Sequence, residues 1–179
     1  MKFITKVVTG EVRFNYVNTT EARANDLDSE PKFGLTILIP KENSETMGKI
    51  YTGMSNATKN GLNIWGGQVP EDLITCLKDG DLLDRPEYKN HFYINTNSKY
   101  KPQVVNRELK EITNPEELYN GCYGRVSINF YPYNHLESGN CGIAAGLLNI
   151  QKLRDGQRIS NRSSAADDFD IVEDDGILI

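Results

Sequence analysis

The most regular pattern of apolar and polar positions lies between residues 121 and 156. Every second side chain in Cys122–Phe130 is small or apolar, whereas the alternate positions in Tyr123–Tyr131 carry rings, amides, a hydroxyl and a guanidinium. A period of two predicts a strand with one face in the core. Pro132 lacks a backbone donor, so we expect the strand to end there. The apolar run Ile143–Lys152 predicts a returning strand, which makes the pair a long antiparallel hairpin.

The N-terminal part of the chain predicts two further strands. Residues 2–17 alternate in the same way, with Tyr16 on the apolar face, and the polar, turn-prone residues 18–31 predict a loop. Lys32–Lys41 alternates again, and the presence of Leu38 on its second face indicates burial on both sides.

A change of period marks one amphipathic helix. Apolar residues recur at helical spacing across residues 44–60, which predicts a helix that packs on the core. Either Asn43 or Ser44 is placed to cap its first turn, and Gly61 is placed for a left-handed position after its last turn.

The stretch that follows the helix, residues 61–90, is irregular. Within it, Pro70–Lys78 predicts a short helix. Trp65 lies between glycines, where it either pins this stretch to the core or stacks on a nucleobase, and we favour the first interpretation. Three neighbouring acidic residues lack the donor spacing of a calcium loop and predict a solvated turn. These are Asp79, Asp81 and Asp84.

Residues 91–109 predict a strand, a turn and another strand. The turn holds Lys99, Tyr100 and Lys101, which present two ammonium groups around an aromatic ring. This combination suits contacts with phosphates and stacking on bases. Asn114–Leu118 predicts a helical turn that leads into the hairpin.

Strands therefore outnumber helices, and we predict a mainly β fold. Five or six strands with one helix favour a five-stranded Greek-key barrel of the oligonucleotide-binding (OB) type, with a long irregular insertion and a flexible C-terminal tail. We divide the 179 residues into a domain at residues 1–162 and a disordered acidic tail at residues 163–179.

Charge is segregated along the chain. The net charge is −5, but six of the 25 acidic residues lie in residues 167–179, so that the remaining body carries 19 acidic against 20 basic residues. Basic residues gather just before the tail, at Lys152, Arg154, Arg158 and Arg162. The opposite signs predict that the tail meets a partner or the chain's own basic surface, and a purely solubilising tail is the alternative.

The composition indicates a soluble protein in a reducing, intracellular compartment. No apolar run approaches the roughly 20 residues of a membrane helix, and the N-terminus lacks the pattern of a signal peptide. The three cysteines are widely spaced, and Cys122 and Cys141 fall at opposite ends of the predicted hairpin. We therefore expect neither a disulfide between them nor a zinc site.

Motifs of catalysis are absent from the sequence. It has no phosphate-binding Gly-x-x-x-x-Gly-Lys loop, no Gly-x-Ser-x-Gly elbow and no His-Glu-x-x-His pair, and its two histidines are His91 and His135. We expect a non-catalytic protein without cofactor or metal. A metal-dependent nuclease, whose carboxylates can be scattered, is the alternative from another class, and a protein-only adaptor or virion component is a third.

The sequence features that are typical of nucleic-acid binding agree with one another better than those of catalysis. Rings for stacking alternate with charge on the outer face of the hairpin, and the turn at residues 99–101 repeats this combination. Stacking tolerates any base, so little sequence preference is expected. The alternative is that these tyrosines pack against a neighbouring strand or subunit. The predicted nucleic-acid-binding residues are Lys99, Tyr100, Lys101, Tyr123, Arg125, Tyr131, Lys152 and Arg154.

The pattern GCYGRVSINFYPYN…GIAAGLLNIQKLRDGQRI…SSAADDF resembles the single-stranded DNA-binding proteins of tailed bacteriophages and prophages. The segments Ile39–Lys41 and Lys101–Val105 fit the same pattern, so the resemblance covers nearly the whole chain. Its most specific parts are Leu148–Gly156 and Asp167–Phe169. It implies an OB fold that coats single-stranded DNA during replication and recombination in the cytoplasm of a bacterial host.

The resemblance also implies roles for the tail. Acidic tails of such proteins contact partners such as a polymerase, helicase or primase, and some relatives form homodimers. The residues that match this tail are Asp167, Asp168, Phe169 and Asp170. This chain runs ten residues past Phe169, so either Phe169 or the terminal Ile177–Ile179 is the expected anchor. As a mechanism, we expect the tail to compete with DNA for the basic surface.

Overall fold

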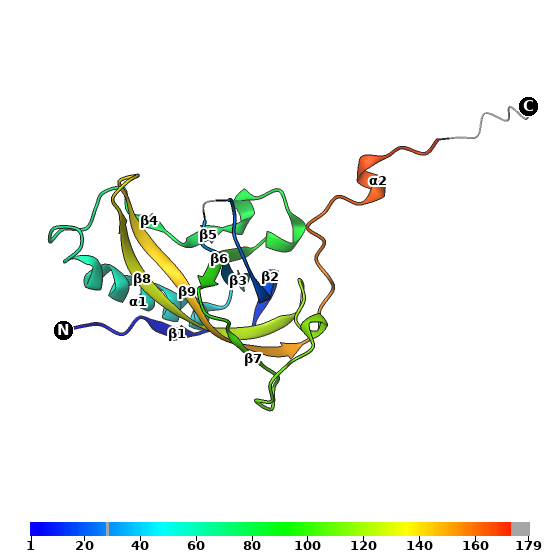
Figure 1. Ribbon diagram of the computed structural model, residues 1–179, viewed down its shortest axis with the longest axis horizontal. Helices are drawn as coiled ribbons and strands as arrows, with labels where there is room; N and C mark the ends of the chain where they lie inside the picture. Colours follow the sequence, from blue (N-terminus) through cyan, green and yellow to red (C-terminus); the bar gives the residue numbers. More distant parts are fainter. Residues whose placement is uncertain (28, 173–179) are drawn as a thin grey trace, which may run out of the picture.

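Strands are the main secondary structure of the computed structural model, which describes residues 1–27 and 29–172. Figure 1 shows a curled sheet with one long helix packed against it and the C-terminal tail extending away from the body. The strands are β1 (Lys6–Val8), β2 (Val12–Arg23), β3 (Lys32–Pro40), β4 (Ile74–Thr75), β5 (Leu77–Asp79), β6 (His91–Ser98), β7 (Gln103–Val105), β8 (Tyr123–His135) and β9 (Asn140–Arg154), and the helices are α1 (Ser44–Gly61) and α2 (Ala165–Asp168), with single 3₁₀ turns η1 (Gly80–Leu82), η2 (Pro86–Tyr88) and η3 (Pro115–Glu117).

The strand pairings close five of the strands into a ring. The order is β1-β8-β2-β3-β6-β9-β4, and β8 also pairs with β9, so the path β8–β2–β3–β6–β9 returns to its start. All neighbours in this ring are antiparallel except β6 and β9, which meet in parallel at Asn97 and Gly146. The predicted mainly β fold of OB type is confirmed, although the described sheet has nine strands, several of them short.

Apolar side chains from all five ring strands fill the inside of the ring. The predicted alternation places them there because successive side chains of a strand point to opposite faces. α1 packs its apolar stripe against β8 and β1, and Leu38 is buried on the second face of β3, as predicted. The buried apolar residues include Val12, Phe14, Leu35, Ile37, Ile39, Ile50, Ile94, Val126, Ile128, Phe130, Leu147 and Ile150.

Both ends of α1 have local explanations. Asn43 is the N-cap, and its side-chain oxygen accepts a hydrogen bond of 3.2 Å from the amide of Thr46. The prediction that Gly61 takes a left-handed conformation is wrong, because Gly61 is the last helical residue and the positive φ angles belong to Gly66 and Gly67. A side chain at Gly61 would come within 2.6 Å of the ring of Trp65, so close packing explains this glycine.

The N-terminal strand prediction was wrong at both ends. Residues 2–17 divide into β1 and β2, and β2 continues to Arg23 through part of the predicted loop at residues 18–31. The prediction that Tyr16 lies on the inward face is wrong, because Tyr16 is 52% exposed and Asn15 is fully buried instead. Tyr16 has a φ of 46°, and the register shifts between Asn15 and Asn18, so the alternation reverses there.

Pro132 does not end β8, which continues to His135. Phe130 donates its amide to the carbonyl of Thr5 on the side of β1, and by alternation the nitrogen of Pro132 points to the same side. β1 begins only at Lys6, opposite Asn129, so the missing donor of Pro132 costs no hydrogen bond of the ladder.

The irregular stretch after α1 is built differently from the prediction. The predicted short helix at Pro70–Lys78 is wrong, because this segment forms β4 and β5, which pair with β9 and β6. Trp65 pins the stretch to the hairpin: its ring nitrogen donates to the carbonyl of Tyr133 at 3.1 Å, and its ring packs on the core.

The predicted acidic turn is tied to one lysine. Asp79 and Asp81 each lie 2.6 Å from the ammonium group of Lys41. These contacts lower the pKa values of both carboxyl groups and raise the pKa of Lys41. In the described part of the chain, no helix is long and apolar enough to cross a membrane.

Candidate nucleic-acid interface

The outer face of β8 carries the alternate side chains of the hairpin. Gly124, Val126, Ile128 and Phe130 are buried inside the ring. Tyr123 and Tyr131 therefore lie on the opposite face, outside the core, and their contact with DNA stays a prediction. The other residues on this outer face are Arg125, Ser127 and Asn129.

Tyr131 forms a flat platform on this face. It is 38% exposed, lies opposite Ala144, and has its ring 3.6 Å from where a side chain on Gly146 would begin. Burial raises the pKa of its phenol further above the ordinary value of about 10, at which a tyrosine is already neutral at physiological pH. A neutral ring beside two small residues is accessible to a stacking base.

Tyr123, at the other end of the hairpin, already has cationic partners. The guanidinium of Arg154 lies 3.7 Å from its ring centroid and that of Arg13 lies 5.5 Å away. Arg154 is held there by Glu11, whose carboxylate accepts hydrogen bonds of 2.7 and 3.0 Å and raises the pKa of Arg154. A base that stacks on the Arg154 side of this ring must displace Arg154.

The two remaining basic residues of the hairpin differ in accessibility. The side chain of Lys152 is only 14% exposed, and its ammonium group lies 2.7 Å from Asp155, whose pKa it lowers. Arg125 is exposed, and its Nε donates to Gln151 at 2.6 Å, which orients the guanidinium along the outer face. Arg125 is therefore the better placed of the two for a phosphate.

The turn with Lys99, Tyr100 and Lys101 links two parts of the ring. It starts after Ser98, which pairs with Phe33 of β3, and leads to Gln103, which pairs with Asn149 of β9. The ring of Tyr100 is 82% exposed, and Lys99 lies 3.1 Å from Glu30. The turn thus lies between β3 and the outer face of the hairpin.

The structure separates the predicted residues into two groups. Tyr131 and the turn at residues 99–101 flank the junction where β6 meets β9. Tyr123, Lys152 and Arg154 lie at the far end of the hairpin, and eight residues of strand place Tyr123 roughly 26 Å from Tyr131. Arg125 lies between the groups.

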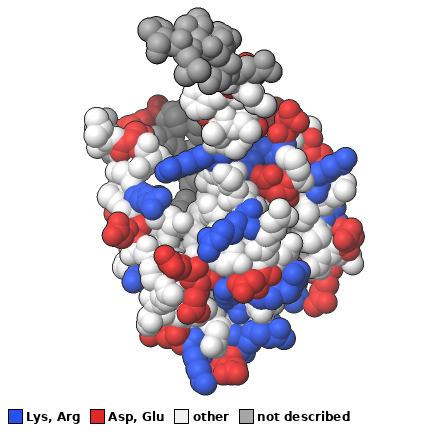
Figure 2. All heavy atoms as spheres, turned by 90° about the vertical axis from the view of Figure 1, so that its right-hand side faces the viewer, with Lys and Arg blue, Asp and Glu red and all other residues white. Residues whose placement is uncertain are grey.

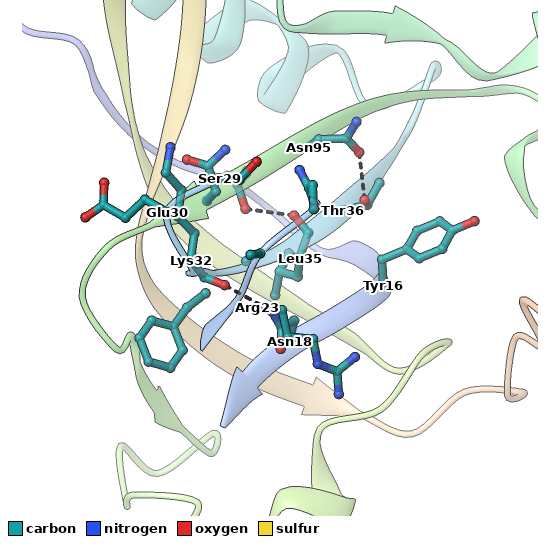
Figure 3. A pocket seen from close by; sticks show the side chains of 15 residues that line it. Tyr16, Asn18, Arg23, Ser29, Glu30, Lys32, Leu35, Thr36 and Asn95 are labelled. Carbon is teal, nitrogen blue, oxygen red and sulfur yellow. Dashed lines mark hydrogen bonds between the residues drawn. The ribbon is translucent and has the colours of Figure 1, made fainter. Parts of the chain in front are cut away.

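A groove across β2, β3 and β6 was missed by the sequence reasoning. It has a volume of about 710 Å³, and one of its lining residues, Glu30, forms an ion pair with Lys99 of the turn. Figure 3 shows Tyr16 and Arg23 projecting from β2 and Asn95 from β6 around it. In OB folds, oligonucleotides bind across the second and third ring strands, which are β3 and β6 here. Its side chains include Tyr16, Asn18, Arg23, Lys32, Phe33, Thr36, Asn95 and Asn97.

This groove offers hydrogen-bonding groups, rings and positive charge. The hydroxyl of Thr36 donates to the Asn95 side chain at 2.7 Å, and the amide of Asn18 donates to the Lys32 carbonyl at 3.1 Å. Among the described residues, the side-chain oxygen of Asn18 is buried without a hydrogen-bond partner. The alternating amides of β6 were a signal in the sequence, whereas the exposure of Tyr16 was not, because it depends on a positive φ angle.

The chain after β9 is fixed to the body beside this groove. Asn161 exchanges hydrogen bonds with the buried Asn15, at 2.8 and 3.3 Å, and accepts one of 2.6 Å from Arg85. Arg85 also donates to the hydroxyl of Tyr16 at 2.8 Å. The acidic tail therefore starts close to a residue that lines the groove.

The described part of the tail contains α2 and a short extended segment. The hydroxyl of Ser164 accepts from the amide of Asp167, and this capping box lowers the pKa of Asp167. Phe169 is 74% exposed, and the alternative anchor at Ile177–Ile179 lies outside the described residues. The division of the chain at residue 162 stays a prediction.

Charges on the body are mixed. Figure 2 views the side from which the tail leaves and shows basic and acidic side chains interspersed on that face. A face with mixed charges favours DNA contacts that combine stacking with a few cations over neutralisation by one large basic patch.

No group of three or more potential metal ligands occurs in residues 1–27 and 29–172.

Comparison with known proteins agrees with this geometry. The family described as the single-stranded DNA-binding protein of Enterobacter phage Enc34 matches residues 5–178. Protein p50 of Acyrthosiphon pisum secondary endosymbiont phage 1 is 26% identical over 161 residues, which cover 82% of this chain and 84% of p50.

Solved structures give the same result. The single-stranded DNA-binding protein from bacteriophage Enc34 has a TM-score of 0.73 at 25% identity, over 93% of this chain and 90% of that one. The same protein in complex with single-stranded DNA has a TM-score of 0.74 at 24% identity, over 87% and 90%. In fold alone, the chain is also similar to gp2.5, a single-stranded DNA-binding protein encoded by bacteriophage T7, with a TM-score of 0.64 at 11% identity over 99% and 100%. The resemblance predicted from the sequence is confirmed, and the chain belongs to the family of the Enc34 phage single-stranded DNA-binding protein.

Proposed function

We propose that this protein binds single-stranded DNA with little sequence preference. The observation that carries the proposal is the exposed, neutral ring of Tyr131, which lies beside the junction of β6 and β9 and close to the OB groove. A solved relative of the same family is a complex with single-stranded DNA, which supports this assignment.

In the proposed complex, bases stack on Tyr131 and Tyr100 while Arg125, Lys99 and Lys101 contact phosphates. The groove with Tyr16, Arg23 and Asn97 continues this path. Tyr123, Lys152 and Arg154 form a second, weaker contact region, because their ion pairs with Asp155 and Glu11 must open before they bind DNA.

The proposed role is non-catalytic and belongs to phage DNA replication and recombination in the host cytoplasm. The protein coats and protects single strands, and it needs no cofactor for this, because stacking and charge supply the affinity. Incubation of labelled DNA with magnesium tests the alternative of a nuclease, since only an enzyme shortens the strand.

Salt dependence is the first test of DNA binding. For wild type, the logarithm of the affinity for a single-stranded oligonucleotide should fall against the logarithm of salt by about 0.7 per phosphate contact. Arg125→Ala should reduce this slope by about 0.7, because one contact is lost. Fluorescence anisotropy measures both slopes.

Lys152→Ala is the matched control for Arg125→Ala, because the side chain of Lys152 is mostly buried and its ammonium group is paired with Asp155. Its slope should fall by clearly less than that of Arg125→Ala, because Lys152 belongs to the second, weaker contact region. A flat salt dependence of the wild type, or equal affinity for duplex and single strands, would refute the proposal.

We further propose that the tail competes with DNA and recruits replication partners through Asp167, Asp168, Phe169 and Asp170. The position of Asn161 next to Arg85 and Tyr16 supports competition, because the tail begins at the edge of the groove. Contact with a polymerase, helicase or primase, and homodimer formation, remain proposals that rest on the resemblance.

Deletion of residues 163–179 should raise affinity for a short oligonucleotide severalfold at low salt and have little effect at high salt. The reason is that the acidic tail and the DNA phosphates bind the same basic side chains, and salt screens both interactions. The control is a triple variant that keeps the chain length, Asp167→Asn with Asp168→Asn and Asp170→Asn. It should show part of the gain in DNA affinity. Unchanged affinity at low salt in the deletion variant would end the competition model.

A further inference from the structure

Asn15 of β2 is a fully buried polar residue, and both polar atoms of its side chain have partners. Its oxygen accepts hydrogen bonds from the backbone amide of Tyr16, at 2.9 Å, and from the side chain of Asn161, at 2.8 Å. Its nitrogen donates to the hydroxyl of Tyr88 at 3.0 Å and to the side-chain oxygen of Asn161 at 3.3 Å. Burial of an amide is costly unless it is satisfied in this way, so Asn161 completes the core at this point.

Tyr16 has a left-handed backbone conformation that turns its ring outward. Its φ angle of 46° is unusual and strained for a bulky residue. The hydrogen bond from its amide to the buried side chain of Asn15 stabilises this conformation. As a result, the side chain of Tyr16 is 52% exposed and lies at the edge of the groove on β2, β3 and β6 (Figure 3). Backbone strain of this kind occurs at binding sites, where it places a functional side chain.

The guanidinium of Arg85 anchors the outer end of this ring. It donates to the hydroxyl of Tyr16 at 2.8 Å and lies 5.8 Å from the ring centroid. It also donates to the side-chain oxygen of Asn161 at 2.6 Å and forms an ion pair with Glu87. Because Glu87 balances its charge and two other side chains occupy its donors, Arg85 is poorly placed to bind a phosphate. Its planar group of donors joins Tyr16 to Asn161 instead.

Asn161 belongs to the segment after β9, residues 155–161, which we call the strap. Contacts with the body fix the strap before it reaches Asn15. The amide of Gly156 donates to the hydroxyl of Tyr119 at 3.1 Å, the guanidinium of Arg13 donates to the carbonyl of Gln157 at 2.6 Å, and the amide of Ile159 donates to the carbonyl of Asn120 at 2.9 Å. The position of Asn161 is therefore determined by the fold of the body.

We propose that Arg85 and Asn161 are positioning residues for DNA binding, which hold the ring of Tyr16 where a nucleobase stacks on it. The inference rests on the proposed function and extends the DNA site to the strap, a segment outside the OB ring. Neither residue touches the DNA. A ring that is held in place before binding loses little freedom when a base stacks on it, so its anchor increases the affinity.

Substitutions of Tyr16 separate the ring from its anchor. Tyr16→Ala should weaken binding of a labelled single-stranded oligonucleotide by roughly 5- to 150-fold, the usual loss for one stacked base. Tyr16→Phe keeps the ring and removes only the hydroxyl that Arg85 holds, so it should weaken binding by about two- to tenfold. Fluorescence anisotropy measures both affinities, and thermal melting shows that the variants fold.

Substitutions of the anchor test whether it acts through the ring. Arg85→Ala and Asn161→Ala should each cause a loss of the same size as Tyr16→Phe. In the Tyr16→Ala background, neither should weaken binding further, because the ring that they position is gone. Arg85→Ala should also leave the salt slope close to that of wild type, whereas Arg125→Ala lowers it. A purely structural role of Arg85 would not produce this dependence on the ring.

Asn60→Ala is the matched control for Asn161→Ala. Asn60 also exchanges two hydrogen bonds with a distant segment, at 2.8 and 2.9 Å with the backbone of Phe3, but it lies on α1 and should bind DNA like wild type. The inference would be overturned, with DNA binding intact, by wild-type affinity of Tyr16→Ala or by a loss from Arg85→Ala that adds to the loss from Tyr16→Ala. A salt slope that Arg85→Ala lowers by about 0.7 would also overturn it, since Arg85 would then contact a phosphate. A wild type that does not bind single strands would refute the proposed function and the inference with it.

Discussion

Tyr131→Ala is expected to weaken binding of single-stranded DNA by about 1–3 kcal/mol, or roughly 5- to 150-fold. The ring lies on the outer face of β8 with small residues of β9 beside it, so its loss removes a stacking surface. Tyr100→Ala should have an effect of similar size, because its ring is 82% exposed. Fluorescence anisotropy with a labelled oligonucleotide measures both.

Tyr51→Ala is the matched control for these substitutions. Tyr51 is 52% exposed, as accessible as the proposed stacking residues, but it lies on α1, away from the groove on β2, β3 and β6. Its affinity should equal that of wild type. Tyr123→Ala should fall between the two, since Arg154 covers part of that ring. If Tyr131→Ala bound like wild type while Tyr123→Ala lost affinity, the DNA path would follow the far end of the hairpin instead.

Phe130→Ala is expected to lower the free energy of unfolding by about 3–5 kcal/mol. Phe130 is 1% exposed and fills the space between the hairpin and α1, where Gly53 leaves room for its ring. Removing the ring leaves a cavity that neither the strand nor the helix can close. Denaturant unfolding followed by circular dichroism measures the loss.

The neighbouring Tyr131 provides the control for Phe130. The two residues are adjacent in β8 and point to opposite faces, so Tyr131→Ala should cost less than about 1 kcal/mol of stability. The pair separates the two roles of this strand, because one substitution acts on folding and the other on DNA binding. A loss of less than 1 kcal/mol for Phe130→Ala would mean that its ring does not support the contact with α1.

The hairpin could be predicted from the sequence because its information is local. Alternation from Cys122 to Tyr131 determines which side chains face the core, whatever the rest of the fold does. The helix was predicted, with Asn43 as one of two candidate N-caps, for the same reason: a cap and an apolar stripe are both local signals.

Features that depend on distant parts of the chain were not predictable in this way. Pro132 alone predicts the end of a strand, and only the short length of β1 explains why it is tolerated inside β8. The exposure of Tyr16 depends on a left-handed residue and a register shift against β3. Pro70–Lys78 forms strands because β6 and β9 offer edges there, which outweighs any local preference for helix.

The candidate site also combines residues that local sequence indicates with contacts that only the fold creates. Tyr131 and the turn at residues 99–101 are candidates from the chemistry of their residue types alone, and their contact with DNA stays a prediction. The internal partners of Tyr123 and Lys152 were not predictable, because Glu11 is far from Arg154 in the sequence and the Lys152–Asp155 pair requires the chain to bend after β9. The groove on β2, β3 and β6 also needed the fold, since only the alternating amides of β6 have a distinctive spacing in the sequence.

The pairing of β2 with β8 has a consequence for synthesis of the protein. Val12 pairs with Gly124, so about 110 residues must leave the ribosome before β2 can pair with β8. At the usual rates of translation this takes about 6 to 22 s, during which one edge of β2 stays unpaired. Long-range closure of this kind also slows folding itself. The nascent chain is therefore expected to depend on chaperones until the hairpin emerges, and rapid expression should favour aggregation over the folded protein.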